Sequence, residues 1–360
     1  MVNTCQKCNM NNSNQVELRV PNLLSGVRLD KTISTLLGIS RSEVSELISN
    51  QCVLLNGNAL KSPSKTASNG DSIRIVFPQS DTPSLQPPDL APPDANSMNS
   101  RFQAPDLAPP GAIASIGSHI VYSDSDLVVI DKPAGLIVHP GAGNNTGTLI
   151  DALVGLFPDI GLLAENVICA KNRPGIVHRL DKNTSGLMVV ARSELSYHSL
   201  VAQLSSRQVE RVYRCLVWGS PKASDGVVDG PIGRSSSHRT KFSVVAQGKP
   251  SITRFHVLER FGFGHTTLAL LECKLETGRT HQIRVHLSQI GLPVVGDDQY
   301  GGAVNTKRDP MGTLSTLKRQ FLHAGHLAFV HPATEELVTF RSHLPADLQQ
   351  VLDDLKLATV

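Results

Sequence analysis

The sequence predicts an α+β protein that has a small N-terminal α/β module and a larger domain. We expect the larger domain to be built around a largely antiparallel or mixed β-sheet with flanking helices, because its strand-like and helix-like segments lack a regular βαβ rhythm. A length of 360 residues suits two domains, at roughly 150 residues each, and 40% hydrophobic residues suffice for two cores. We divide the chain into a disordered tail (1–15), a module (16–77), a Pro-rich linker (78–117) and the large domain (118–360).

The module shows two short helices followed by short strands. Leu29, Ile33, Leu36 and Leu37 share one helical face, which predicts the first helix. Gly38 separates it from a second helix, opened by the capping-box pattern of residues 40–43 and carrying apolar Val44, Leu47 and Ile48. Asn56-Gly57 predicts a tight turn between strands, and residues 71–76 predict one more strand.

The segment between the two domains has the composition of an extended tether. It is rich in proline, and PDLAPP occurs at residues 88–93 and again at 105–110. Proline fixes the backbone and removes hydrogen-bond donors, so we expect a semi-rigid linker rather than packed structure. Cys5 and Cys8 form a C-x-x-C in the tail, but no second ligand pair follows, and we expect no metal site.

The large domain opens with residues 128–140, which predict a strand, a turn and a second strand. Tyr197, Leu200, Val201 and Leu204 have helical spacing, so a helix is expected there. Residues 209–219 predict a strand with Tyr213 on the same face as Cys215 and Val217, and residues 265–278 predict a long strand.

A helix over residues 281–290 follows, in which Thr280 is expected to be the N-cap and Ile283, Leu287 and Ile290 the buried face. The start of a helix carries partial positive charge and unpaired N–H groups. Basic Arg279, His281 and Arg284 gather at this start together with Thr280. The segment therefore predicts an anion site, for a phosphate or a carboxylate.

Four ionisable residues interrupt an otherwise apolar stretch, GIVHRLDKNTSGLMVVA, at residues 175–191. We expect Asp181 to follow a strand and to lie in a turn beside a cleft, with His178, Arg179 and Lys182 around it. An adjacent guanidinium would keep its carboxylate charged and oriented, and Arg284 is the candidate. Such a carboxylate can serve as a nucleophile or a base, whereas the alternative is an aspartate that only bonds the turn backbone.

Charge and composition restrict the partners. The net charge is +3, so a nucleic acid would have to bind at local basic patches, such as Arg234, Arg239 and Lys241 in the loop 233–241. We find no membrane-length apolar run, signal peptide, nucleotide-binding glycine loop or metal cluster, and expect no membrane association, no metal and no cofactor. A cytoplasmic location is the simplest expectation, and an organelle remains open.

The N-terminal module resembles the small RNA-binding module of the S-four type, named after a ribosomal small-subunit protein. The resemblance covers about sixty residues and rests on the two short helices and the strands that follow them. Arg28, Lys31 and Arg41 lie near the exposed starts of those helices. The resemblance implies that these three residues contact RNA.

The large domain resembles the RluA-type family of RNA pseudouridine synthases from about Ile120 to Leu348. The motifs that carry this resemblance occur in the same order as in the family: KPAGLIVHP, HRLDKNTSG, RVYRCLVWG, PIGR, ETGRTHQIRVHLSQIGLPVVGDDQYG and FLHAGHLAFVHP. The resemblance implies that Asp181 is the catalytic aspartate, that Tyr213 packs on the target base, that Arg284 pairs with the aspartate, and that Arg179 enters the space left by the extruded nucleotide.

The implied reaction isomerises uridine without any cofactor. The enzyme would flip the base out of its stack, and His178, Lys182, Arg279 and His281 would join the RNA-binding residues. Asp181 could attack the anomeric carbon, take a proton from the neighbouring ribose carbon, or add to the ring. We expect a monomer whose substrate is large-subunit ribosomal RNA.

Three alternatives stay open at this point. Transfer RNA is the second substrate class. A non-catalytic RNA-binding or ribosome-assembly protein could keep the same fold. A glycosidic hydrolase would need a second carboxylate near Asp181, which the turn does not supply.

Overall fold

A computed structural model describes residues 15–20, 24–37, 41–76, 116–140, 146–167, 173–235, 238, 241–263, 266–304, 309, 312, 314 and 316–358. The chain divides into two compact units, Met1–Gln103 with Glu165–Lys171, and Ala104–Ala164 with Asn172–Val360. Tail residues 1–14, most of the expected linker, Cys5, Cys8, both PDLAPP segments and Arg239 lie outside the described residues.

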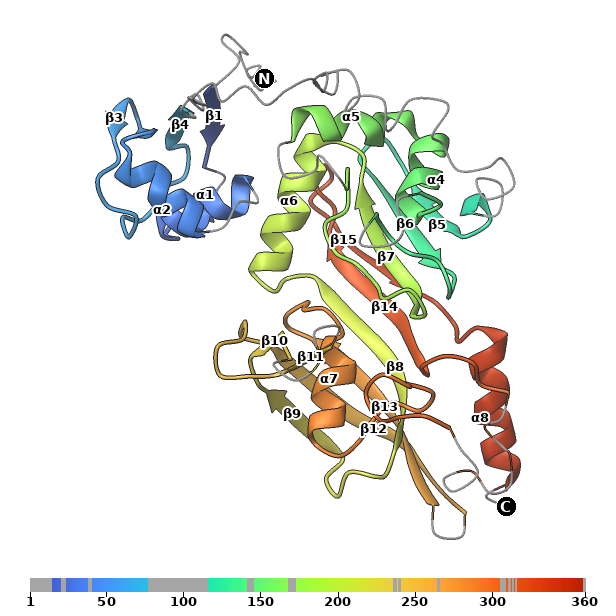
Figure 1. Cartoon of the computed structure of the whole chain (residues 1–360). Coiled ribbons are helices and arrows are strands. Elements are labelled where there is room, and N and C mark those ends of the chain that lie inside the picture. The colour runs from blue at the N-terminus through green and yellow to red at the C-terminus, as the bar shows by residue number, and fades with distance from the viewer. Residues whose placement is uncertain are drawn as a thin grey trace, which may run out of the picture. The chain divides into compact units, whose positions relative to one another are not determined.

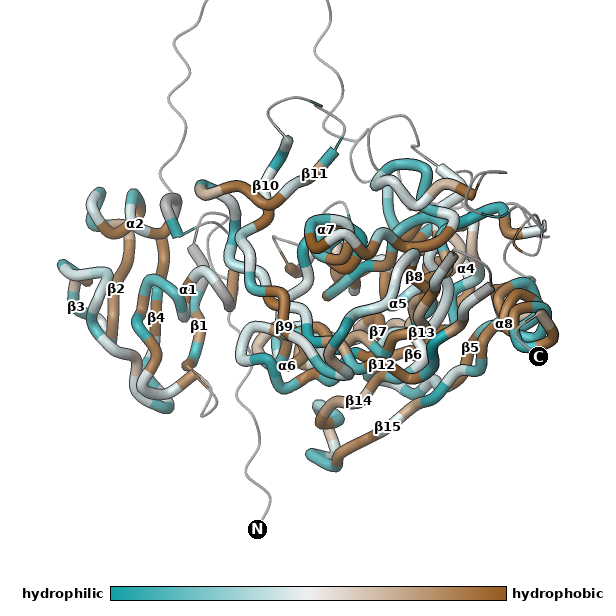
Figure 2. Tube along the Cα trace, turned by 90° about the horizontal axis from the view of Figure 1, so that it is seen from below, coloured by the Kyte–Doolittle hydropathy of each residue, from teal (hydrophilic) through white to brown (hydrophobic). Residues whose placement is uncertain are grey.

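The first unit has two helices, α1 (Leu29–Leu37) and α2 (Arg41–Ser49), and a sheet in the order β1-β4-β2-β3. The strands are β1 (Gln15–Arg19), β2 (Val53–Leu55), β3 (Asn58–Ala59) and β4 (Ser72–Val76), and all their pairings are antiparallel. Leu29, Ile33 and Val44 from the helices pack in one core with strand residues such as Ile73. Figure 2 shows hydrophobic residues along β2 and β4, at the centre of this sheet.

The expected turn at Asn56-Gly57 is confirmed. Both residues have positive φ, 50° and 82°, as a two-residue hairpin turn between β2 and β3 requires. The expected α/β character of the unit is also confirmed, whereas the pairing of β1 with β4 was not foreseen because its partners are far apart in the sequence.

Nine strands form the sheet of the second unit in the part of the chain that is described, in the order β5-β6-β7-β14-β8-β13-β12-β9, with β15 beside β14 (Figure 1). They are β5 (Ile120–Ser123), β6 (Leu127–Lys132), β7 (Ser185–Ala191), β8 (Glu210–Trp218), β9 (Asp225–Asp229), β12 (Ile252–Phe263), β13 (Thr266–Leu275), β14 (Leu322–Val330) and β15 (Leu337–Arg341). Only the pair β7–β14 is parallel among these described strands, so the predicted largely antiparallel, mixed sheet is confirmed.

Helices flank this sheet as predicted. They are α4 (Leu149–Leu156), α5 (Pro158–Asn166), α6 (Glu194–Ser205), α7 (Gln282–Gln289) and α8 (Ala346–Ala358). Helix α6 packs on β7 and β14, and α7 packs on β12 and on the hairpin strand β11 (Phe242–Val244), which pairs with β10 (Ile232–Arg234). Figure 1 shows α6 and α7 against different parts of the same sheet.

Gly186 lets β7 and β14 approach each other. Its φ is 115°, and a Cβ there would lie 2.3 Å from the backbone oxygen of Ala324. No side chain fits in that space, so this glycine fixes the parallel pairing that places the turn before β7 beside β14 and β8.

Several local expectations were wrong. The structure has no second strand between Pro133 and Pro140, because β6 ends at Lys132 and the chain turns at Ala134-Gly135 without re-entering the sheet. The segment before Asp181 is not a strand either, and only Ile176 makes a bridge, to Val190. Ile290, expected on the buried face of α7, is 43% exposed.

Candidate active site

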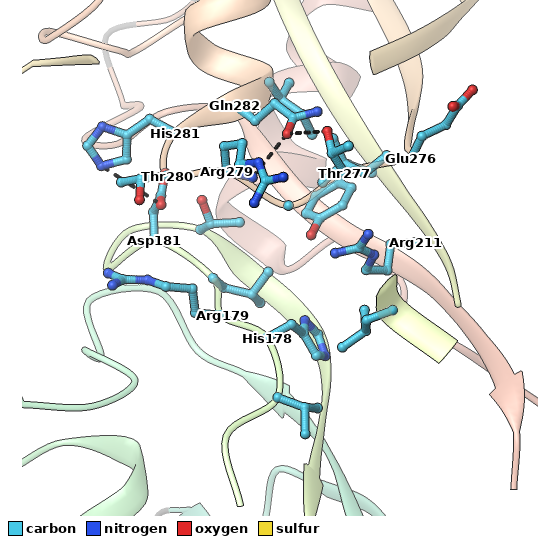
Figure 3. Close-up of a pocket in the computed structure, with 18 of the residues that line it drawn as sticks. His178, Arg179, Asp181, Arg211, Glu276, Thr277, Arg279, Thr280, His281 and Gln282 are labelled. Atoms are coloured by element: carbon cyan, nitrogen blue, oxygen red, sulfur yellow. Dashed lines mark hydrogen bonds and ion pairs between the residues drawn. The ribbon is translucent and has the colours of Figure 1, made fainter. Parts of the chain in front are cut away.

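A pocket of about 510 Å³ opens in the second unit, and three parts of the chain supply most of its lining. The turn 176–184 before β7 supplies Asp181, strand β8 supplies Arg211 and Tyr213, and the loop from β13 into α7 supplies residues 275–284. In Figure 3, Asp181 lies between Arg179 on one side and His281 on the other. Residues far apart in the sequence therefore face one cavity.

A hydrogen-bonded chain of side chains holds Asp181. Arg284 Nη1 donates to Asp181 Oδ2 at 2.9 Å. The opposite edge of the same guanidinium is bound by Asp297, through Nε to Oδ2 at 2.7 Å and Nη2 to Oδ1 at 2.9 Å. Because this fork fixes the plane of the guanidinium, Arg284 fixes the direction of the Asp181 carboxylate. The predicted contact between Arg284 and Asp181 is present.

Burial makes this arrangement strongly electrostatic. Arg284 is 7% exposed and Asp297 is 2% exposed, whereas the side chain of Asp181 keeps 16% of its surface. Burial acts to lower the pKa of Arg284, but the hydrogen bonds of Asp297 and the charge of Asp181 outweigh it and raise that pKa above its ordinary value. Arg284 is therefore a permanent cation between two carboxylates.

Only one of the two carboxylates faces the pocket. Both oxygens of Asp297 accept from Arg284, and Asp297 does not line the cavity. Asp181 lines it, with Oδ1 3.9 Å from His281 Nε2. A hydrolase that works with two opposed carboxylates needs both of them at the scissile bond. The other acidic residue of the described pocket lining, Glu276, has one oxygen bound by Arg207 and the other by Arg254.

His281 begins helix α7 in an unexpected way. Its φ is 56°, in the left-handed region, and it takes the N-cap position without any side-chain cap bond, so the prediction that Thr280 caps the helix was wrong. Gln282 holds the preceding loop instead, since its Oε1 accepts from Thr277 Oγ1 at 2.8 Å and from Arg279 N at 3.0 Å. His281 Nδ1 lies 2.7 Å from the hydroxyl of Tyr300, and burial lowers the pKa of His281.

Tyr213 is buried in strand β8 and lines the pocket. Burial raises its pKa to about 12, so the phenol stays neutral and uncharged at physiological pH. A buried neutral ring beside a charged carboxylate offers a flat surface against which a planar base can stack.

The turn that carries Asp181 is tied to the preceding turn by Lys132, which sequence reasoning missed. Its side chain is fully buried, and its Nζ donates to the backbone oxygens of Pro133, Leu136 and Lys182 at 2.8, 3.0 and 3.1 Å. The lysine of KPAG therefore links that motif physically to HRLDK. Burial lowers the pKa of Lys132 to about 7.

The other residues predicted for this turn differ in position. Arg179 is exposed at the pocket, with Nη1 3.3 Å from His139 Nε2. His178 lines the pocket but accepts a hydrogen bond from Val189 N at 3.1 Å, and burial lowers its pKa to about 3, so it acts as a neutral structural acceptor. Lys182 is exposed and does not line the pocket.

The remaining candidates lie at the pocket, on a hairpin or in the first unit. Arg279 lines the pocket and its Nε donates to Pro250 O at 3.4 Å. Arg234 is exposed on β10, its guanidinium 5.8 Å from the ring centroid of Phe242, and Lys241 directly precedes β11. In the first unit, the buried Asp30 binds both Arg28 and Arg41, at 3.0 and 2.5 Å, and Lys31 is exposed.

Among the described residues, no group of three or more His, Cys, Asp or Glu side chains could hold a metal ion. None of the described helices has both the length and the apolar character needed to cross a membrane.

Comparison with known proteins assigns both parts of the chain. A sequence model described as RNA pseudouridylate synthase matches residues 126–289, and one described as S4 domain matches residues 27–73. Both resemblances seen in the sequence are thereby confirmed.

The curated relatives agree with these matches. A protein of Nitrosomonas europaea named ribosomal large subunit pseudouridine synthase D is 40% identical over 96% of this chain and 89% of its own length. The proteins of the same name from Xanthomonas campestris (39% identical, 94% of this chain, 91% of its own length) and Pseudomonas aeruginosa (47%, 66% and 71%) are also similar. The chain thus belongs to the RNA pseudouridine synthases, a class of isomerases, and carries an S4 domain.

Proposed function

We propose that this protein converts uridine to pseudouridine in large-subunit ribosomal RNA and that Asp181 is the carboxylate that acts on the nucleoside. The observation that carries the residue assignment is the Asp181–Arg284 pair, 2.9 Å apart in a pocket that Tyr213 also lines. The substrate assignment rests on three similar proteins that are named ribosomal large subunit pseudouridine synthases.

The reaction rearranges bonds within one nucleotide. The bond between ribose C1′ and uracil N1 breaks, the ring turns, and a bond forms between C1′ and C5, while the C5 proton leaves and N1 gains a proton. No atom is gained or lost, so the pocket needs a directed carboxylate and a surface that holds the detached ring. Asp181 can begin by attacking C1′, by removing the C2′ proton, or by adding to the ring, and all three routes start from Oδ1, the oxygen that Arg284 does not bind.

The substrate enters as a flipped nucleotide. A pocket of about 510 Å³ is in the range typical of small-ligand sites and accommodates one nucleotide. Extruding a base costs a few kcal/mol, and stacking on Tyr213 returns on the order of 1–3 kcal/mol. Arg179, exposed at the pocket, fills the space that the base leaves in the RNA.

Basic side chains of both units bind the RNA backbone. Asp30 fixes the guanidiniums of Arg28 and Arg41, which remain half exposed, next to the exposed Lys31. Arg234 and Lys241 on the β10–β11 hairpin, and Arg279 and His281 at the pocket, extend the contacts in the second unit. Lys182 joins them from the surface of the catalytic turn. The two units together gain affinity through effective concentration.

In this proposal the protein acts as a monomer in the cytoplasm. The cytoplasm is proposed because similar proteins are named for ribosomal RNA modification. Light scattering of the purified protein at increasing concentration tests the oligomeric state, and a mass of 38.7 kDa is expected throughout.

Mapping pseudouridines in the RNA of cells with and without this protein tests the substrate assignment. We expect specific sites in large-subunit ribosomal RNA to revert to uridine when the protein is absent, and to be restored by the wild-type chain. Because the product is an isomer, nucleosides must be separated rather than weighed. If pseudouridines were lost only from transfer RNA, transfer RNA would be the substrate instead. An unchanged pseudouridine map would contradict the proposal.

A further inference from the structure

Arg211 is a buried arginine of the pocket with no role in the site described above. It lies on strand β8, lines the pocket and is 6% exposed. Its Nε is buried and has no hydrogen-bond partner within the described parts of the chain, where no acidic side chain forms an ion pair with it either. A guanidinium stays charged in proteins, so this one lacks the counter-charge that buried cations need.

Two other arginines that line the pocket, Arg284 and Arg207, are already paired with carboxylates. Arg284 binds Asp181 and Asp297, and Arg207 binds Glu276 at 2.8 Å. Glu276 also accepts from Arg254 at 2.6 Å, so its charge is compensated without Arg211. Within the described pocket, the positive charge of Arg211 is therefore left for a ligand.

The loop opposite Arg211 is shaped to leave room for it. A Cβ on Gly278 would lie 2.8 Å from Arg211 Nη1, closer than any real carbon approaches. Gly278 thus allows the guanidinium to lie against the loop that leads into α7. In Figure 3, Arg211 points from its strand into the pocket, between His178 and Thr277.

The place of Arg211 relative to Tyr213 suggests what it binds. Residues two apart on a strand share a face and are about 6.5–7 Å apart. A uracil stacked on Tyr213 therefore places its own sugar-phosphate within reach of Arg211. A phosphodiester carries a full negative charge and presents two oxygens, which matches adjacent N–H groups of a guanidinium better than a neutral uracil carbonyl does.

We propose that Arg211 binds the phosphodiester next to the flipped uridine, with its guanidinium donating to the free oxygens of that group. This inference rests on the proposed function and deepens it. Arg211 recognises the backbone of the target nucleotide inside the pocket, whereas Arg284 positions the catalytic carboxylate.

The test replaces one RNA phosphate at a time with an uncharged methylphosphonate, on either side of the target uridine in a short hairpin. Pseudouridine formation is measured as kcat/KM, and RNA affinity is measured in the Asp181→Asn background so that the RNA stays unreacted. For wild-type Arg211 we expect one position at which the substitution lowers kcat/KM and affinity by roughly tenfold to a hundredfold.

Arg211→Met should lower kcat/KM by a similar factor on normal RNA and should be insensitive to the methylphosphonate at that position. Arg211→Lys should keep part of the sensitivity, because it keeps the charge without the fork. Arg207→Met is the matched control, since it removes a pocket arginine that already has a partner, and it should respond to the methylphosphonate like the wild type.

Stability separates a binding role from a structural one. Because Arg211 lacks a partner in the free protein, Arg211→Met should unfold at no lower urea concentration than the wild type. Equal methylphosphonate sensitivity of wild type and Arg211→Met at every position would overturn the inference. A different pair of results would overturn the proposed function alone: the protein forms pseudouridine in no RNA, but the methylphosphonate still weakens RNA affinity in a way that depends on Arg211.

Discussion

Arg284 links Asp181 in the pocket to Asp297 beneath it: one edge of its guanidinium binds both oxygens of Asp297, and Nη1 reaches Asp181 at 2.9 Å. The buried carboxylate of Asp297 therefore orients the guanidinium of Arg284. That guanidinium in turn orients the carboxylate of Asp181. Asp297 touches no ligand in this arrangement and is a positioning residue.

Substitution of Asp297 tests this chain of contacts. Asp297→Asn keeps the shape but removes the charge and one fork acceptor, so we expect kcat to fall while KM for RNA stays near the wild-type value. Arg284→Met should be worse, because it leaves Asp297 buried without a counter-charge and costs about 3–5 kcal/mol of unfolding free energy. Steady-state kinetics and urea unfolding measure both effects, and wild-type kcat in Asp297→Asn would contradict the positioning role.

The ring of Tyr213, rather than its hydroxyl, should carry most of its contribution. Burial raises its pKa to about 12, so the hydroxyl does not ionise in the assay range. We expect Tyr213→Phe to keep a large part of kcat/KM and Tyr213→Leu to lose about 1–3 kcal/mol of base binding, or roughly fivefold to 160-fold in kcat/KM. If both variants lost activity equally, the hydroxyl would have a chemical role that stacking does not explain.

His178 should make the protein sensitive to acid. Burial lowers its pKa in the fold to about 3 from an ordinary value of 6.5, so between these pH values only the unfolded chain binds the proton. The contribution of neutral His178 to the free energy of unfolding is fully present above pH 6.5 and is lost as the pH falls below that value. His178→Gln keeps an acceptor for Val189 N–H, and its unfolding free energy should fall less steeply on acidification, by up to about 1.4 kcal/mol per pH unit. Parallel curves for the two proteins would show that His178 does not titrate this way.

The first unit should contribute phosphate contacts through Lys31, which is exposed on α1. Lys31→Gln should reduce the slope of log affinity against log salt by about 0.7–0.9, the amount that one released counterion contributes. Lys356→Gln, on helix α8 and paired with Glu259, serves as the control and should leave the slope unchanged. Equal slopes for all three proteins would remove Lys31 from the RNA surface.

Sequence patterns correctly predicted helices and a turn whose formation depends on residues close together in the sequence. The helices at Leu29–Leu37 and Glu194–Ser205 follow from apolar spacing, and the Asn56-Gly57 turn from its residue types. The contact between Arg284 and Asp181 was also anticipated, because both lie in motifs whose charges need a partner.

The sequence could not predict the contacts that depend on the order of the strands. Asp297 lies 13 residues beyond Arg284 in an irregular segment, and no periodicity points it back at the guanidinium. Lys132 and Arg211 look like ordinary surface cations until the sheet buries them. Thr280 has the residue type of a helix cap, but Gln282 binds the loop and His281 takes the cap position in a left-handed conformation.

The central claim is that the carboxylate of Asp181, aimed by Arg284, performs the isomerisation. Asp181→Asn keeps the size of the side chain and an oxygen for Arg284, so single-turnover pseudouridine formation on large-subunit ribosomal RNA tests the claim most directly. We expect the rate to fall on the order of a thousandfold or more while RNA affinity stays at the wild-type level. A rate near that of the wild type would contradict the account.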